Sequence, residues 1–175
     1  VLPEEASIHC DSVMIGEAEP VWNEMLEDVE RDSMKTYYRG DIADDLNAYP
    51  LPRRDLSTGN PFMGLQPVVT SRGCPYSCDF CSVWKFFGRK IRHVEVDRVV
   101  RDIENSGTSK FMFLDDNIVG DQVYAKKLFQ ALKDLNIQWV GQASISFVKN
   151  GELLKMAAES GCKGLFVGLE TVSEQ

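Results

Sequence analysis

The chain has 175 residues, of which 43% are hydrophobic and 26% charged, so it can bury one good core and part of a second. Its formal net charge is −8 and its basic residues are scattered, which argues against nucleic acid as a partner. No apolar run approaches the ~18 residues that a membrane span needs, and no signal-peptide pattern opens the chain.

The first part of the chain predicts a small α/β unit followed by a linker. Residues 12–16 have the composition of a buried strand. Residues 21–31 predict a helix whose apolar face carries Trp22, Met25, Leu26 and Val29. Residues 40–65 are rich in Pro, Asp and Gly and show no periodicity, and they are longer than a usual loop. We therefore expect a first domain at residues 1–39 and a linker at 40–65.

From residue 66 onward, strand-like runs alternate with segments of helical spacing. The expected strands are residues 67–70, 110–114, 137–142 and 164–169. The expected helices begin near Val96, after Asp121 as an N-cap, and at Glu152. This alternation predicts an α/β fold with parallel strands, in which ligands bind at the carboxyl ends of the strands. The chain opens on Val1 rather than Met and closes soon after an apolar run, so we expect a fragment.

Three cysteines follow the first of these strands with the spacing C-x3-C-x2-C: Cys74, Cys78 and Cys81. Three thiolates can hold three irons of a 4Fe–4S cluster and leave the fourth iron without a protein ligand. A closed cluster or a structural zinc takes four ligands, so a zinc site would need Cys10, Cys162 or His93 in addition. Five cysteines, three of them clustered, also fit a reducing cytosol better than a disulfide framework, and we expect a cytoplasmic protein.

The cysteine loop, with the aromatic Phe80 just before the third cysteine, closely resembles the cluster loop of radical S-adenosylmethionine (radical SAM) enzymes. Other motifs occur in the order seen in members with an N-terminal cobalamin-binding domain: Gly16-Glu17-Ala18-Glu19, Pro52-Arg53-Arg54-Asp55-Leu56, Asp115-Asp116-Asn117, Gly141-Gln142-Ala143-Ser144 and Gly168-Leu169-Glu170. The resemblance implies that residues 1–39 are the C-terminal remnant of a doubly wound cobalamin-binding domain. It implies that residues 66–175 are the N-terminal part of a partial (β/α) barrel, with about four of six strands.

The resemblance also implies a cofactor site. Cys74, Cys78 and Cys81 would hold the 4Fe–4S cluster, and the open iron would chelate the amino and carboxylate groups of S-adenosylmethionine (SAM). An electron from the cluster would then break a carbon–sulfur bond and release a 5′-deoxyadenosyl radical. Phe80 would lie along the adenine. No residue of the later chemistry can be assigned from the sequence.

Polar residues at the ends of later strands complete the site that the resemblance implies. Asp115 or Asp116 would accept hydrogen bonds from the methionyl ammonium. Glu170 would bind the ribose hydroxyls, and Gln142 would point into the same space. As alternatives, the acidic pair could form a turn that caps the next helix, and Glu170 could be a solvated residue at a strand end.

The expected function is that of a radical SAM enzyme of the cobalamin-associated type, with cobalamin itself a possible cofactor. Its substrate would be a small or medium organic molecule, changed by methyl transfer to an unactivated carbon or by oxidative ring closure. An electron donor such as flavodoxin or ferredoxin would be its partner. Two alternatives stay open: a methylthiotransferase-like enzyme, and a metal-binding module in which a zinc site has no catalytic role.

Overall fold

The computed structural model describes residues 2–56 and 64–170, so part of the expected linker and the last five residues lie outside the described ranges. The chain divides into two compact units, with the boundary between Tyr49 and Pro50. No helix within the described ranges is long and apolar enough to cross a membrane.

The first unit is a parallel β-α-β element with short flanking helices. Its elements are α1 (Pro3–Ser7), β1 (Val13–Gly16), η1 (Glu19–Val21), α2 (Trp22–Glu30), β2 (Tyr37–Gly40) and η2 (Leu46–Ala48). The predicted strand and helix are both present. The sequence did not reveal β2, which pairs in parallel with β1 over four residues. A strand this short has too little periodicity to be recognised.

Two features of the first unit differ from expectation. The unit extends past residue 39 to Tyr49, and Ala43 and Leu46 in this extension are buried. In addition, the apolar face of α2 is not covered within the described residues, since Trp22 and its neighbours along the helix remain about half exposed. A helix of this kind normally buries such a face against a further element.

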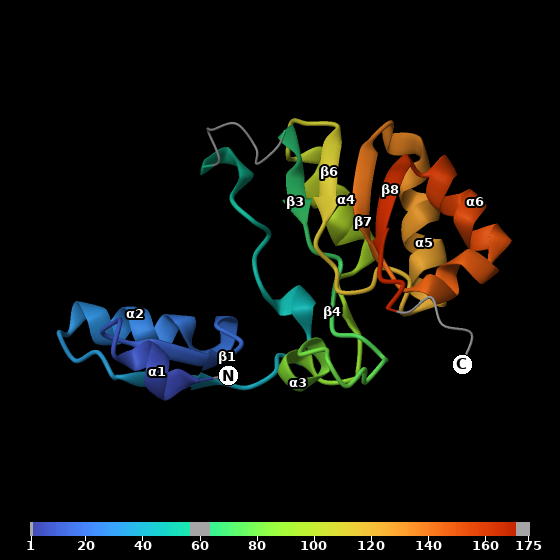
Figure 1. Ribbon diagram of the computed structural model, residues 1–175. Helices are drawn as coiled ribbons and strands as arrows, with labels where there is room; N and C mark the ends of the chain where they lie inside the picture. Colours follow the sequence, from blue (N-terminus) through green and yellow to red (C-terminus); the bar gives the residue numbers. More distant parts are fainter. Residues whose placement is uncertain (1, 57–63, 171–175) are drawn as a thin grey trace. The chain divides into compact units, whose positions relative to one another are not determined.

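The second unit contains a four-stranded parallel sheet in the order β3-β6-β7-β8. Its strands are β3 (Gln66–Val68), β6 (Lys110–Phe113), β7 (Gln138–Ala143) and β8 (Cys162–Val167). The connecting helices α4 (Val96–Glu104), α5 (Gln122–Leu132) and α6 (Gly151–Glu159) lie along one face of the sheet (Figure 1). The predicted parallel α/β arrangement of a partial barrel is confirmed. Short 3-10 turns complete the unit: η3 (Arg54–Leu56), η5 (Lys133–Leu135) and η6 (Ile145–Lys149).

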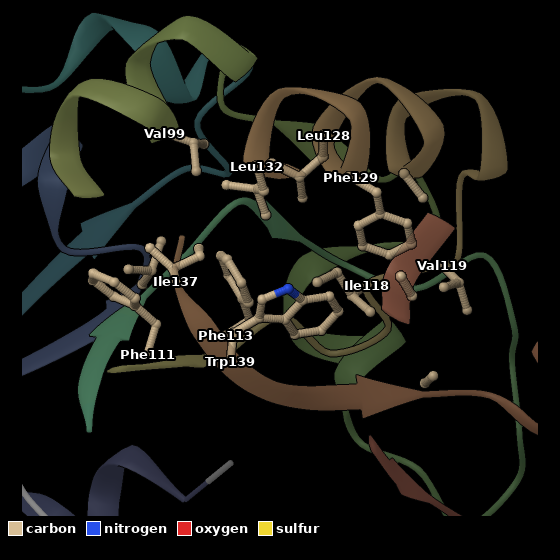
Figure 2. Close-up of a cluster of buried hydrophobic side chains, with 14 of the residues drawn as sticks. Val99, Phe111, Phe113, Ile118, Val119, Leu128, Phe129, Leu132, Ile137 and Trp139 are labelled. Atoms are coloured by element: carbon tan, nitrogen blue, oxygen red, sulfur yellow. The ribbon is translucent and has the colours of Figure 1, made fainter. Parts of the chain in front are cut away.

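The core of the second unit lies between the sheet and these helices (Figure 2). Trp139 of β7 is fully buried, with the Phe113 ring at its edge and the Phe129 ring stacked on it. Its indole Nε1 donates to the carbonyl of Ser160 at 3.1 Å, so the polar group of this large side chain is satisfied. This packing fixes β6 and β7 against α5, and with them the strand ends that carry the site.

A buried ion pair ties the segment before the sheet to α4. Arg54 donates through Nε and Nη2 to the two carboxylate oxygens of Asp102, at 2.9 and 2.6 Å. Both side chains are only 9% exposed. Bidentate geometry of this kind compensates much of the cost of removing two charges from water.

Candidate active site

The residues singled out from the sequence gather at one edge of the sheet, because the carboxyl ends of its parallel strands lie together. The cysteine loop follows β3, the acidic pair follows β6, Gln142 lies near the end of β7, and Glu170 follows β8. Figure 1 shows this edge at the lower side of the sheet, next to α3 (Val83–Phe87).

The cysteine loop leaves the sheet through a short antiparallel pair, β4 (Ser71–Arg72) and β5 (Arg92–His93). All three cysteines are free thiols; Cys78 is exposed, whereas Cys74 and Cys81 are partly buried. The loop is closed by a backbone hydrogen bond from Cys81 N to Cys78 O at 3.0 Å. Trp84 Nε1 donates to the same carbonyl at 3.1 Å, which holds α3 against the loop.

Gly73, just before the first cysteine, must be glycine. Its φ of +98° lies in the region that side chains disfavour, and a Cβ there would lie 2.8 Å from the carbonyl oxygen of Lys90. The absence of a side chain therefore allows the base of the loop to pack directly on the backbone of residues 88–90.

Asp115 is completely buried and anchors the base of the loop from β6. Its Oδ1 accepts hydrogen bonds from Ser71 Oγ at 2.6 Å and Thr70 Oγ1 at 2.7 Å, and its Oδ2 accepts from Thr70 N at 3.3 Å. Burial raises the pKa of this carboxyl, and the hydrogen bonds from Ser71 and Thr70 oppose that shift. Asp115 has no exposed surface for a ligand ammonium, so the structure gives it a different role from the expected one.

Asp116 lies on the opposite face of the same strand end and is partly exposed. Its Oδ2 accepts a hydrogen bond from Gly73 N at 3.0 Å. Side chains alternate across a strand, so Asp115 continues the buried face of Phe111 and Phe113, whereas Asp116 continues the face of Met112. This alternation is the sequence signal that could have separated the two carboxylates.

Asn117 connects three parts of the site, which the sequence did not indicate. Its Oδ1 accepts from Ser144 N at 3.1 Å, and its Nδ2 donates to Ser144 Oγ at 3.4 Å. The same Nδ2 lies 4.0 Å from Cys74 Sγ. This buried amide therefore links the ends of β6 and β7 to the first cysteine.

The other expected cofactor residues are on the surface of this edge. Phe80 is 71% exposed at the tip of the loop. Gln142 is exposed on the face of β7 opposite Trp139. Glu170 is also exposed, with a φ of +58°, and its carboxylate folds back over Gly168. None of these three side chains forms a hydrogen bond with another described residue, which leaves them available to a ligand.

The donor set fits an iron–sulfur cluster better than a single metal ion. Within residues 2–56 and 64–170, no three His, Cys, Asp or Glu side chains converge as ligands of one ion. A tetrahedral zinc needs thiolate sulfurs at about 2.3 Å from one point, whereas the thiolates of a cubane bind different irons. Three free thiols on one accessible loop suit the second arrangement.

The residues considered as a fourth zinc ligand are engaged elsewhere. Cys162 begins β8, at the end of the sheet opposite the loop, and its Sγ donates to Gly164 O at 3.7 Å. The His93 ring stacks on Tyr124 with centroids 4.1 Å apart, and burial lowers its pKa. Cys10 belongs to the first unit, where its Sγ donates to backbone carbonyls.

Residues 68–175 match the Radical SAM superfamily. The chain is 31% identical over 183 aligned positions to bacteriochlorophyllide d C-12(1)-methyltransferase of Chlorobaculum tepidum, covering 99% of this chain and 40% of that protein. It is 28% identical to anaerobic magnesium-protoporphyrin IX monomethyl ester cyclase of Cereibacter sphaeroides, over 59% of this chain and 18% of that one. The chain thus spans less than half the length of these relatives.

A solved structure shares the fold. The radical SAM methyltransferase TsrM of Kitasatospora setae, determined with cobalamin and a [4Fe-4S] cluster bound, superposes with a TM-score of 0.57 at 21% identity. The match covers 63% of this chain and 23% of that protein.

Proposed function

Because this chain belongs to the radical SAM superfamily, we propose that residues 66–175 are the N-terminal part of a barrel that reductively cleaves SAM at a 4Fe–4S cluster, yielding a 5′-deoxyadenosyl radical. The observation that carries the proposal is the position of three free thiols on one loop, at the carboxyl edge of a parallel sheet. Ligand sites in such folds occur at this edge.

Within this site, Cys74, Cys78 and Cys81 hold the cluster. Asp116, rather than the buried Asp115, accepts hydrogen bonds from the methionyl ammonium, because it is partly exposed on the side of the sheet away from the helices. Gln142 lies on that same side of β7 and contributes a polar contact.

Three further residues complete the proposed site. Phe80 provides the wall against the adenine, and Glu170 binds the ribose. Asp115 acts by positioning: it holds Thr70 and Ser71, and therefore the base of the cysteine loop, from the interior.

The proposed reaction is methyl transfer to carbon of an organic substrate. Support comes from the C. tepidum relative, a bacteriochlorophyllide methyltransferase that aligns with nearly the whole of this chain. Oxidative ring closure is the second candidate, favoured by the similarity to the cyclase. Cobalamin is proposed as a further cofactor of the longer protein. The parallel β-α-β element of the first unit is compatible with the remnant of a doubly wound domain that the sequence predicts at residues 1–39, although the unit itself runs to Tyr49.

Anaerobic reconstitution with iron and sulfide tests the central proposal. We expect four irons per chain and a low-temperature paramagnetic signal after reduction, lost on replacing Cys74, Cys78 or Cys81 with Ala. Cys162→Ala is the matched control and should keep the signal. Four irons bound equally by all loop variants would contradict the assignment, and one zinc with no iron would support the metal-binding module.

SAM binding tests the open iron and Asp116 together. Adding SAM should change the spectrum of the reduced cluster. Asp116→Asn should weaken SAM binding about tenfold or more, since a hydrogen bond to a charged group contributes about 1.5–3 kcal/mol. The exposed Asp134→Asn should bind SAM normally. An unperturbed spectrum of an intact cluster would contradict the open site.

A further inference from the structure

The surface next to the cysteine loop concentrates positive charge. Residues 82–92 contain four basic residues and no acidic one, in a chain with 27 acidic and 19 basic residues. Lys85, Arg89 and Lys90 are exposed, and none of the three forms an ion pair with another described residue. We name residues 82–92 the basic segment.

Three other lysines of the second unit pair with carboxylates of α6, whereas Lys110, Lys127, Lys149 and Lys163 form no ion pair with another described residue and are scattered along the chain. Lys126 of α5 binds Glu152 at 2.6 Å, and Lys133 of η5 binds Glu159 at 2.9 Å, both toward α6. No carboxylate of a described residue neutralises the three exposed cations of the basic segment in this way. The basic segment therefore carries a local excess of positive charge although the net charge of the chain is −8.

The basic segment is attached directly to the proposed cluster loop. It begins one residue after Cys81, and α3 is held to the loop by the Trp84 hydrogen bond to Cys78 O. Its far end pairs with the base of the loop, because Arg92 lies opposite Arg72 in the β4–β5 pair. Between them, the backbone of residues 88–90 packs on Gly73.

Aromatic groups accompany the charges. Phe86 is 49% exposed, and Lys85 Nζ lies 5.5 Å from the centre of the Trp84 ring. Exposed aromatic side chains are enriched at protein interfaces, and surrounding charges steer a partner of opposite sign. Small, charged surfaces of this kind suit the weak, transient complexes of electron-transfer proteins.

We propose that the basic segment is the docking surface for an acidic one-electron carrier protein of the flavodoxin or ferredoxin type. This inference rests on the proposed function, because only a cluster at Cys74, Cys78 and Cys81 gives the carrier a group to reduce here. In the complex, the carrier loses one electron and the oxidised cluster gains it, with no atoms transferred. Docking beside the loop keeps the distance between donor and cluster short.

The test measures how fast reduced flavodoxin bleaches the visible absorbance of the reconstituted chain. Arg89→Glu/Lys90→Glu is compared with Lys110→Glu/Lys163→Glu, which changes the net charge equally but at exposed positions at the amino ends of β6 and β8. At low ionic strength we expect the first variant to react at least tenfold more slowly than wild type, and the control to match wild type. The difference should shrink above ~0.1 M salt, where charges are screened beyond about 10 Å.

Reduction by a small neutral reductant, photoreduced 5-deazaflavin, distinguishes a defect in docking of the carrier from a defect in the cluster itself. Equal reduction of all proteins by deazaflavin, with slow reduction of only Arg89→Glu/Lys90→Glu by flavodoxin, supports the docking surface. Equal rates with flavodoxin as well would overturn the docking surface and leave the proposed function intact. A wild-type chain that loads no cluster would overturn both. If the double variant fails to load, Lys85→Glu replaces it, with the same two outcomes.

Discussion

Replacing Asp115 with Asn tests whether this carboxylate holds the base of the cysteine loop. Asn keeps one acceptor oxygen for the hydroxyls of Thr70 and Ser71 but turns an NH2 group toward Thr70 N, which is itself a donor. One hydrogen bond is lost, and a buried N–H is left without an acceptor, which costs about 1–3 kcal/mol. We therefore expect the free energy of unfolding of the second unit to fall by about 2 kcal/mol.

Denaturant unfolding followed by Trp139 fluorescence measures this effect. Trp139 is in the core of the second unit, so a background with Trp22→Phe and Trp84→Phe makes the signal specific for that unit. Asp134→Asn, at an exposed position, is the matched control and should change the stability by less than about 0.5 kcal/mol. An equally small change for Asp115→Asn would refute the anchoring role.

The pH dependence gives a second readout of the same residue. Burial raises the pKa of Asp115 in the folded chain above its ordinary value of 3.8, so the folded state retains this proton to higher pH than the unfolded state does. The stabilisation from this group is complete below about pH 4 and is lost as pH rises through the folded pKa, with a slope of at most about 1.4 kcal/mol per pH unit. The stability difference between wild type and Asp115→Asn should therefore decrease from pH 4 upward. A difference that grows with pH would show that the folded-state pKa is lowered instead.

Two further predictions concern the frame around the site. Arg54→Ala should lower the free energy of unfolding of the second unit by about 3–5 kcal/mol, because it leaves the buried Asp102 carboxylate unpaired. Arg53→Ala breaks an exposed pair and should cost about 0–1 kcal/mol. Equal effects in the unfolding assay would contradict the importance of the buried pair. β8 lies at an edge of the described sheet, with Phe166 63% exposed, so the chain should self-associate, and Phe166→Lys should reduce its apparent mass in light scattering. A monodisperse wild-type monomer would exclude pairing through this edge.

The sequence predicted those parts of the fold in which apolar residues recur at a regular spacing. The helices α4, α5 and α6 carry apolar residues at helical spacing, and Asp121 caps α5 through Val123 N and Tyr124 N as expected. The parallel order followed from the alternation of strands and helices. The end of β3 was placed too late, because residues 69–72 leave the sheet and turn into β4.

What the sequence left open depended on contacts between distant residues. β4 and β5 pair over two residues each, too few for any pattern, although this pair fixes the base of the loop. The different environments of Asp115 and Asp116 depend on which face of β6 meets the helices. The role of Asn117 depends on Ser144 and Cys74, which lie far from it in the sequence.

The anchoring of the cysteine loop at its base has a consequence for maturation of the protein. Thr70, Ser71 and Gly73 are held by hydrogen bonds to the carboxylates that follow β6, whereas the segment from Cys74 to Cys81 has only a few internal hydrogen bonds. We therefore expect folding of the sheet and loading of iron to be separable, since the attachment points use protein groups alone and the tip carries the cysteines. Unlike a zinc finger, whose folding requires its ion, this unit is expected to keep its sheet and core when the iron is removed.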